Sequence, residues 1–202
     1  MTTTRIAFLL DRTGSMASIR EDVIGGYNTF LAEQRDLEED ECPYSITQFD
    51  TSGFDTEQYT DIRDAPALSL DTYVPRAGTN LLDAVARVIG VTEQMPDAGR
   101  TLVVVYTDGE ENASRETTKE QLKTLVESKR ALGWDFVFIG ADIDAFAEAG
   151  QFGFDGSQSY STLKADTAGT WSSVTSSISA YRGNQDYQEA MSSLRKSSKA
   201  NT

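Results

Sequence analysis

The arrangement of the apolar residues most constrains how this chain can fold. Residues 6–10 and 102–106 are uninterrupted apolar runs, and a third run over 134–139 is broken only by Asp135. Such runs are typical of strands that are buried on both faces of a parallel sheet. Segments with helical spacing of apolar residues lie between them. We therefore predict an α/β protein with a Rossmann-like doubly wound, mostly parallel sheet and helices on both faces.

Local signals predict the remaining elements. A capping box at residues 18–21 begins a helix that runs to about residue 38, and a second box at 117–120 begins a helix that Gly133 ends. A further helix begins at Gly78-Thr79-Asn80, with Thr79 as its N-cap. The other expected elements are strands over 44–49 and 157–161, an antiparallel edge strand over 59–62, a short helix around 144–149, and a helix whose apolar face holds Trp171, Val174, Ile178 and Tyr181.

Length and composition favour one domain and exclude several classes of function. The chain has 202 residues, of which 39% are apolar, enough for one well-buried domain. We place it at residues 1–182, followed by a helical or flexible tail over 183–202. The formal net charge of −14 argues against nucleic-acid binding, which needs a basic surface. The sequence has no histidine, which excludes catalytic triads and zinc sites that depend on histidine.

The distribution of apolar residues and cysteine also bears on location. No apolar run approaches the roughly 20 residues that span a bilayer, so we expect no membrane contact. The first residues lead into a five-residue apolar strand, which is too short for the core of a signal peptide. Cys42 is the only cysteine, so no internal disulfide is possible and a reducing compartment fits. We expect a cytoplasmic protein.

Oxygen-bearing side chains follow two of the buried strands. Asp11, Thr13 and Ser15 come directly after the first apolar run, Asp108 follows the run at 102–106, and Thr79 stands at the start of a helix. Ligands bind where parallel strands end, and we expect these residues to converge at the switch point between the first and central strands. Hard cations such as Mg²⁺ prefer an oxygen shell of this kind. Each residue alone also fits an ordinary cap or turn, and only the set is specific.

With this pattern the chain resembles the von Willebrand factor type A domain and its metal-ion-dependent adhesion site. That family has D-x-S-x-S after the first strand, a distant Thr before a helix, and Asp-Gly after the fourth strand. The matching residues are Asp11, Thr13, Ser15, Thr79 and Asp108. Thr13 stands where the family usually has Ser, but it keeps the hydroxyl. The resemblance covers about residues 4–182, and residues 107–112 and 138–142 are similar to small stand-alone bacterial and phage members.

The resemblance implies a bound Mg²⁺ or Mn²⁺ ion. Ser15 and either Thr13 or Thr79 would bind it directly, together with waters that Asp11 and Asp108 orient. A site with few direct carboxylates leaves the cation under-neutralised, and the ligand in the family is commonly an Asp or Glu of a partner protein. The family also implies possible partners, an AAA+ ATPase or a phage or virion assembly. A phage-encoded chain would then be located in the virion.

Three charged neighbours of the motif each have two interpretations. Arg12 would either steer an acidic ligand toward the metal or occupy the surface without such a role. Glu110 and Glu111 lie beside Asp108, where they would either tune the open metal position or be solvated.

We expect a non-enzymatic, metal-dependent protein-binding module. Two other classes of function compete with this expectation. One is a Mg²⁺-dependent phosphohydrolase-like enzyme with an aspartyl nucleophile. Such enzymes use a second Asp two residues on, where this chain has Thr13. The other is a structural or virion assembly protein in which the site is a relic. The sequence has neither a G-x-G-x-x-G motif after the first strand nor a phosphate-binding G-x-x-x-x-G-K-[ST] loop.

Overall fold

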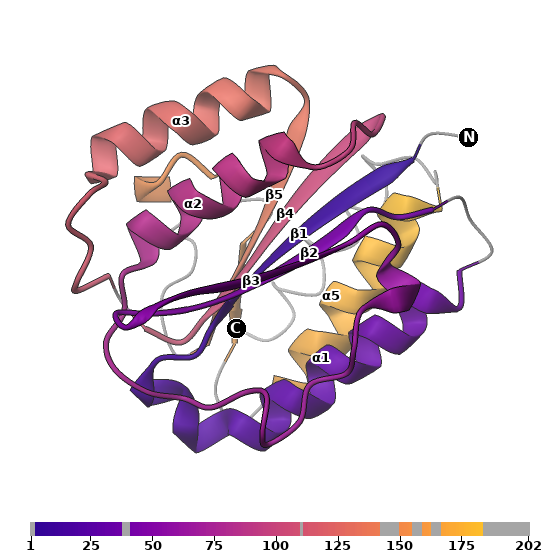
Figure 1. Ribbon diagram of the computed structural model, residues 1–202, viewed down its shortest axis with the longest axis horizontal. Coiled ribbons are helices and arrows are strands. Elements are labelled where there is room, and N and C mark those ends of the chain that lie inside the picture. The colour runs from indigo at the N-terminus through magenta and orange to yellow at the C-terminus, as the bar shows by residue number, and fades with distance from the viewer. Residues whose placement is uncertain are drawn as a thin grey trace.

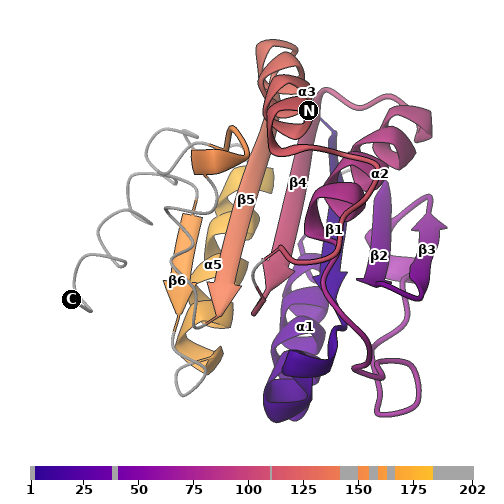
Figure 2. The same ribbon diagram turned by 90° about the vertical axis from the view of Figure 1, so that its left-hand side faces the viewer.

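A six-stranded sheet with the strand order β3-β2-β1-β4-β5-β6 forms the centre of the protein. The computed structural model describes residues 3–37, 41–109, 111–141, 150–154, 159–162 and 167–183. The strands are β1 (Thr4–Asp11), β2 (Tyr44–Asp50), β3 (Gly53–Tyr59), β4 (Arg100–Thr107), β5 (Trp134–Ala141) and β6 (Ser159–Thr162). All neighbouring strands are parallel except β3, which is antiparallel to β2. Figure 2 shows the strands side by side in this order.

Among the described residues, two pairs of helices cover the two faces of the sheet (Figure 1). On one face lie α2 (Leu81–Gln94) and α3 (Lys119–Ala131), and on the other lie α1 (Arg20–Arg35) and α5 (Thr167–Arg182). Two short 3₁₀ helices, η1 (Gly14–Ile19) and η2 (Ile62–Asp64), precede α1 and follow β3. The predicted fold class, with helices on both faces and one antiparallel edge strand, is confirmed.

Consecutive residues of β1 alternate between the two core layers. Phe8 and Leu10 belong to the cluster under α1 and α5, whereas Ala7 and Leu9 belong to the cluster under α2 and α3, and all four are fully buried. The uninterrupted apolar run therefore reflects burial on both faces. The predicted apolar face of the last helix is also confirmed, because Trp171, Val174, Ile178 and Tyr181 of α5 are all buried.

The position predicted for the edge strand is wrong. Residues 59–62 were expected to form it, but the strand is β3, which ends at Tyr59 and pairs with β2 from Asp50↔Gly53 to Tyr44↔Tyr59. A two-residue connection between Asp50 and Gly53 makes the hairpin. The polar side chains of β3 hide this strand from a search for apolar runs, since an edge strand tolerates charged residues on its exposed side.

Three predicted helix starts need correction. Ser18 lies inside η1, and its hydroxyl donates to the carbonyl of Ser15, so it cannot cap α1. The residue at the N-cap of α2 is Asn80 rather than Thr79, and its side chain makes no capping hydrogen bond. The capping box of α3 is formed by Thr118 and Gln121, one residue later than predicted.

The last strand is confirmed, whereas the helix that begins at Arg20 is shorter than predicted. The strand expected over 157–161 exists as β6 and pairs in parallel with β5. The helix that begins at Arg20 ends at Arg35, before the predicted residue 38. The helix expected around 144–149 lies outside the described residues, and of the tail over 183–202 only residue 183 is described. Among the described helices, none is long and apolar enough to cross a membrane.

Candidate metal centre

The strand order places a topological switch point between β1 and β4. The chain proceeds from β1 to β2 on one side of the sheet and from β4 to β5 on the other. Leu10 of β1 pairs with Tyr106 of β4, so Asp11 at the end of β1 and Asp108 just after β4 leave the sheet at the same edge. The carboxyl ends of parallel strands at such a point form the usual ligand crevice of an open α/β sheet.

Asp11 is fully buried at this edge, and both of its carboxylate oxygens accept hydrogen bonds. The amide of Thr13 donates to Oδ1 at 2.6 Å, and the hydroxyl of Thr107 donates to Oδ2 at 2.5 Å. Burial raises the pKa of the Asp11 carboxyl to about 6; the hydrogen bonds from Thr107 and Thr13 oppose this rise, and the nearby charge of Asp108 adds to it. These contacts suit a carboxylate that orients neighbouring groups more than one that binds a cation directly.

The hydroxyl groups of the motif form a short chain toward Asp108. Thr13 Oγ1 lies 3.1 Å from Ser15 Oγ, and Ser15 Oγ donates to Asp108 Oδ1 at 2.6 Å. Thr13 and Asp108 are buried, whereas Ser15 is exposed. Ser15, in the middle of this chain of oxygens, is therefore the member that is open to solvent.

Thr79 comes from a different loop and joins this group beside Gly109. A Cβ atom on Gly109 would lie 2.9 Å from Thr79 Oγ1 and 3.7 Å from Ser15 Oγ. Both hydroxyls thus lie close to one point, and a larger residue at position 109 would displace Thr79. The structure brings together all five residues that the sequence analysis selected: Asp11, Thr13, Ser15, Thr79 and Asp108.

The loop after β4 holds Thr79 in place through contacts that the sequence analysis missed. The side-chain oxygen of Asn112 accepts from the amide of Thr79 at 3.1 Å, and the amide of Asn112 donates to the carbonyl of Thr79 at 3.1 Å. The only signal in the sequence is the position of Asn112 four residues after Asp108. The partner of Asn112 is 33 residues away, so the chain pattern alone could not identify it.

Glu111 serves as the cap that α2 lacks. Its carboxylate accepts from the amide of Leu82 in the first turn of α2 at 2.9 Å. It also accepts from the amides of Ala113 and Ser114, at 2.8 and 2.7 Å, and from the hydroxyl of Ser114 at 2.6 Å. This role differs from both interpretations of Glu111 in the sequence analysis, because the carboxylate is taken up by backbone donors. Glu110 lies outside the described residues.

Arg12 points away from the candidate metal centre. Its guanidinium donates from Nε to Asp50 Oδ2 at 2.7 Å and also pairs with Asp55, and the residue is buried. Arg76 donates to the same Asp50 oxygen at 3.0 Å. Arg12 therefore ties the motif to the β2–β3 hairpin, and it is neither a surface residue nor directed at a ligand of the site.

The donor set fits a hard divalent cation. It contains two carboxylates and three hydroxyls and has no nitrogen or sulfur donor. Within the described ranges, no group of three or more His, Cys, Asp or Glu side chains is placed to hold a metal ion. An ion at this edge would depend on hydroxyl and water oxygens, and Mg²⁺ commonly keeps several waters in its octahedral shell.

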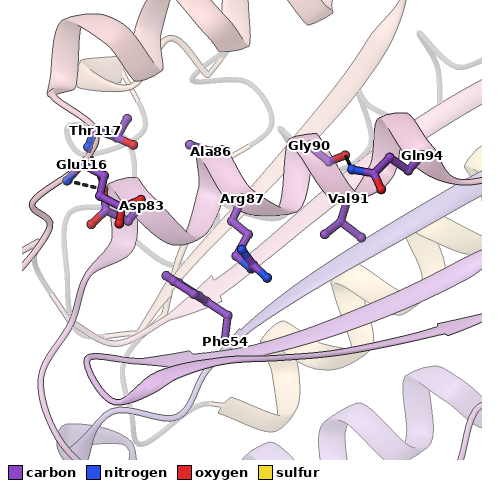
Figure 3. A pocket seen from close by; sticks show the side chains of 9 residues that line it. All are labelled: Phe54, Asp83, Ala86, Arg87, Gly90, Val91, Gln94, Glu116 and Thr117. Atoms are coloured by element: carbon purple, nitrogen blue, oxygen red, sulfur yellow. Dashed lines mark hydrogen bonds between the residues drawn. The ribbon is translucent and has the colours of Figure 1, made fainter.

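A pocket of about 410 Å³ lies elsewhere, between β3 and the outer surface of α2 (Figure 3). Arg87 stands over the ring of Phe54 there, at 5.4 Å from the ring centre. Asp83, at one end, accepts from the backbone amide of Glu116. None of the five residues of the candidate metal centre lines this pocket, so the two places are separate.

Comparison with solved structures identifies the fold as that of the von Willebrand factor type A domain. The vWF domain of the type V pili tip protein Mfa5 from Porphyromonas gingivalis has a TM-score of 0.66 and 10% identity, over 90% of this chain and 96% of that one. A von Willebrand factor type A structure from Catenulispora acidiphila has a TM-score of 0.62 and 15% identity, over 86% of this chain and 42% of that one. At these identities the likeness establishes the fold alone.

A third similar structure carries a metal. Proximal thread matrix protein 1 from the mussel byssus, with a zinc-occupied MIDAS motif, has a TM-score of 0.63 and 15% identity, over 87% of this chain and 48% of that one. This chain thus spans under half the length of the mussel and Catenulispora chains. No model of a known protein family matches the sequence, and no curated protein matches it.

Proposed function

We propose that this protein is a non-enzymatic protein-binding module that holds Mg²⁺ or Mn²⁺ among Asp11, Thr13, Ser15, Thr79 and Asp108. The observation that supports the proposal is the meeting of the Ser15 and Thr79 hydroxyls beside Gly109, at the edge of the sheet where Ser15 is exposed. When bound, the cation would supply an open position for an Asp or Glu carboxylate of a partner protein. Two carboxylates alone leave such an ion short of oxygen ligands.

The surroundings of Asp11 favour binding over catalysis. An aspartyl nucleophile needs an oxygen that substrate can reach, whereas Asp11 is fully buried and both of its oxygens accept hydrogen bonds. Thr13, two residues on, has no acidic proton to donate to a leaving group. Turnover of p-nitrophenyl phosphate that disappears in Asp11→Ala would contradict the non-enzymatic proposal.

The partner is expected to be another protein. One similar structure is a pilus tip protein, which supports protein–protein contact as the class of function. If the protein is cytoplasmic, we propose an AAA+ ATPase as the partner, and if it belongs to a virion, we propose a phage assembly. The likeness to a pilus tip protein suggests the cell surface as an alternative location. Co-purification from the native source distinguishes these partners.

Calorimetric titration with MgCl₂, MnCl₂ and ZnCl₂ tests the metal site. We expect Mg²⁺ and Mn²⁺ to bind and Asp11→Ala to abolish binding. Zn²⁺ should bind more weakly because the chain has no histidine and Cys42 precedes β2, at the end of that strand away from the candidate site. Zn²⁺ is included because the mussel protein has a zinc-occupied motif. Failure of all three ions to bind, or equal binding by Asp11→Ala, would refute the proposed site.

Comparison of Thr79→Ala with Asp11→Ala separates metal binding from partner binding. Thr79 is neutral and comes from its own loop, so Thr79→Ala should keep measurable Mg²⁺ affinity but weaken the partner's carboxylate. Thr79 does not cap α2, so its replacement should leave the midpoint of thermal unfolding close to that of the unmodified protein. A pull-down at fixed Mg²⁺ gives the result once a partner is in hand. If the partner retains Asp11→Ala as strongly as it retains the unmodified protein, binding of the partner does not involve this site.

A further inference from the structure

We propose that Leu70 and Val74 form a second contact for the partner, next to the candidate metal centre. They lie in a segment of residues 65–78, which leads to Thr79. This inference rests on the proposed function and makes it more specific. The ligand would be an extended segment of a partner protein, with an acidic residue for the metal and a large apolar residue a few positions away for Leu70 and Val74.

The exposure of these two side chains is unusual for this molecule. Leu70 is 53% exposed and Val74 is 46% exposed. In the part of the chain that the structure describes, Leu132, at the end of α3, is the only other large apolar side chain with such exposure. A single exposed apolar residue is ordinary, whereas these two lie four residues apart in one segment that is hydrogen-bonded to the candidate site.

Hydrogen bonds fasten the segment directly to the metal motif. The Tyr73 hydroxyl donates to the carbonyl of Asp11 at 2.6 Å. The amide of Arg76 donates to the carbonyl of Arg12 at 2.8 Å, and the amide of Gly14 donates to the carbonyl of Ala77 at 3.0 Å. The segment runs beside α1 and then past the motif toward the start of α2 (Figure 1). A ligand bound at the motif would therefore have this segment as its neighbour.

The segment is ordered by its own contacts, so its apolar side chains form a prepared surface. Arg20 donates from Nε to the carbonyl of Tyr73 at 2.8 Å, and its guanidinium also donates to the carbonyl of Leu70. The amide of Ser69 donates to Thr72 Oγ1 at 2.8 Å. Tyr73, between the two exposed residues, is fully buried. A surface that is already ordered costs little conformational entropy when it binds.

The charge of the chain argues against a second copy as the occupant of this surface. Arg20 contacts the segment and Arg76 lies within it, and the side chain of Arg76 is 52% exposed although it pairs with Asp50. Asp71 is an exposed acidic residue of the same segment. The chain as a whole has a formal net charge of −14, which disfavours a second copy of the chain as the occupant. Glu21 and Asp22 are also exposed beside Arg20, so an acidic residue of the partner would be attracted by the bound cation and not by the surrounding surface.

Selection from a displayed library of random peptides tests the inference, in MgCl₂ and again in EDTA. The baits are the unmodified protein, Leu70→Ser/Val74→Ser, Asp11→Ala, and the control Leu132→Ser, which removes an exposed apolar residue elsewhere. We expect the unmodified protein and the control to enrich an acidic residue together with an apolar residue at a constant spacing, only in MgCl₂. The double variant should enrich the acidic residue alone, and it should bind a selected peptide about tenfold more weakly or worse.

The outcomes separate this inference from the proposed function. Enrichment of an acidic residue without an apolar one, or an apolar preference that survives in the double variant, would overturn the role of Leu70 and Val74 and leave the metal site standing. Absence of any Mg²⁺-dependent acidic enrichment with the unmodified protein would refute the proposed function and, with it, this inference. If the unmodified protein sediments as a dimer and the double variant sediments as a monomer, the surface would instead be assigned to a second copy of the chain.

Discussion

Replacing Glu111 with glutamine tests how the candidate metal centre is assembled. The Glu111 carboxylate joins two segments that are far apart in sequence. One oxygen accepts from the amides of Ala113 and Ser114, and the other accepts from the amide of Leu82 and the hydroxyl of Ser114. A glutamine has only one oxygen, so its NH₂ group must face amide donors on one of the two sides. Either orientation leaves at least one backbone N–H without an acceptor.

The expected cost follows from these contacts. Each lost hydrogen bond to a carboxylate is worth roughly 1.5–3 kcal/mol, and the negative charge at the start of α2 adds about 0.3–1 kcal/mol through the helix dipole. For one lost bond we therefore expect Glu111→Gln to lower the free energy of unfolding by about 2–4 kcal/mol. For a chain of this length, that corresponds to a fall in Tm of roughly 4–16 °C.

Thermal unfolding followed by circular dichroism, in EDTA so that no metal contributes, measures this effect. Glu127→Gln is the matched control, because Glu127 is exposed on α3 and its replacement removes the same charge. Glu111→Gln should also weaken Mg²⁺ binding, since Thr79 lies only two residues before the start of α2. If the two variants shift Tm equally, the carboxylate of Glu111 does not stabilise α2, and the reasoning fails.

Three further predictions follow from the packing and charges. Gly26→Ala should destabilise the protein by about 1–3 kcal/mol in urea unfolding, because its Cβ would lie 2.1–2.4 Å from the ring atoms of Trp171. The control Gly25→Ala should not destabilise it, because nothing lies within 4 Å of that Cβ; equal effects would contradict the packing argument. Burial of Asp50 opposes ionisation, but hydrogen bonds from Arg76, Ser52 and Arg12 lower its pKa below 3.8 overall. Its contribution to stability is therefore present above pH 3.8 and is lost as the pH falls through the lowered pKa; Asp50→Asn should flatten stability in this acid range, and an unchanged acid dependence would exclude this cause. Chelation by EDTA should lower Tm only by the mass-action effect of a weak ligand, and loss of helical signal on chelation would show instead that the fold needs the ion.

Much of the fold could be predicted from the sequence because its signals are local. The apolar runs of β1 and β4 identify strands buried on both faces, and the spacing of Trp171, Val174 and Ile178 identifies α5. These patterns exist because a buried strand or helix face selects apolar residues along a continuous stretch of chain. The edge strand β3 was misplaced because an edge strand has one side open to solvent and needs no such pattern.

The candidate site also has features that the sequence predicts and features that only the folded structure shows. The sequence alone determined the five oxygen-bearing residues and, through the doubly wound fold class it predicts, their convergence at one edge of the sheet. Only the tertiary structure decided that Glu111 caps α2, that Arg12 pairs with Asp50, and that the segment holding Leu70 and Val74 is hydrogen-bonded to the motif. Glu111 and Leu82 are 29 residues apart, and Arg12 and Asp50 are 38 apart. A charged residue has no local pattern that names its partner, because the partner is chosen by the distances and buried donors that arise once the chain has folded.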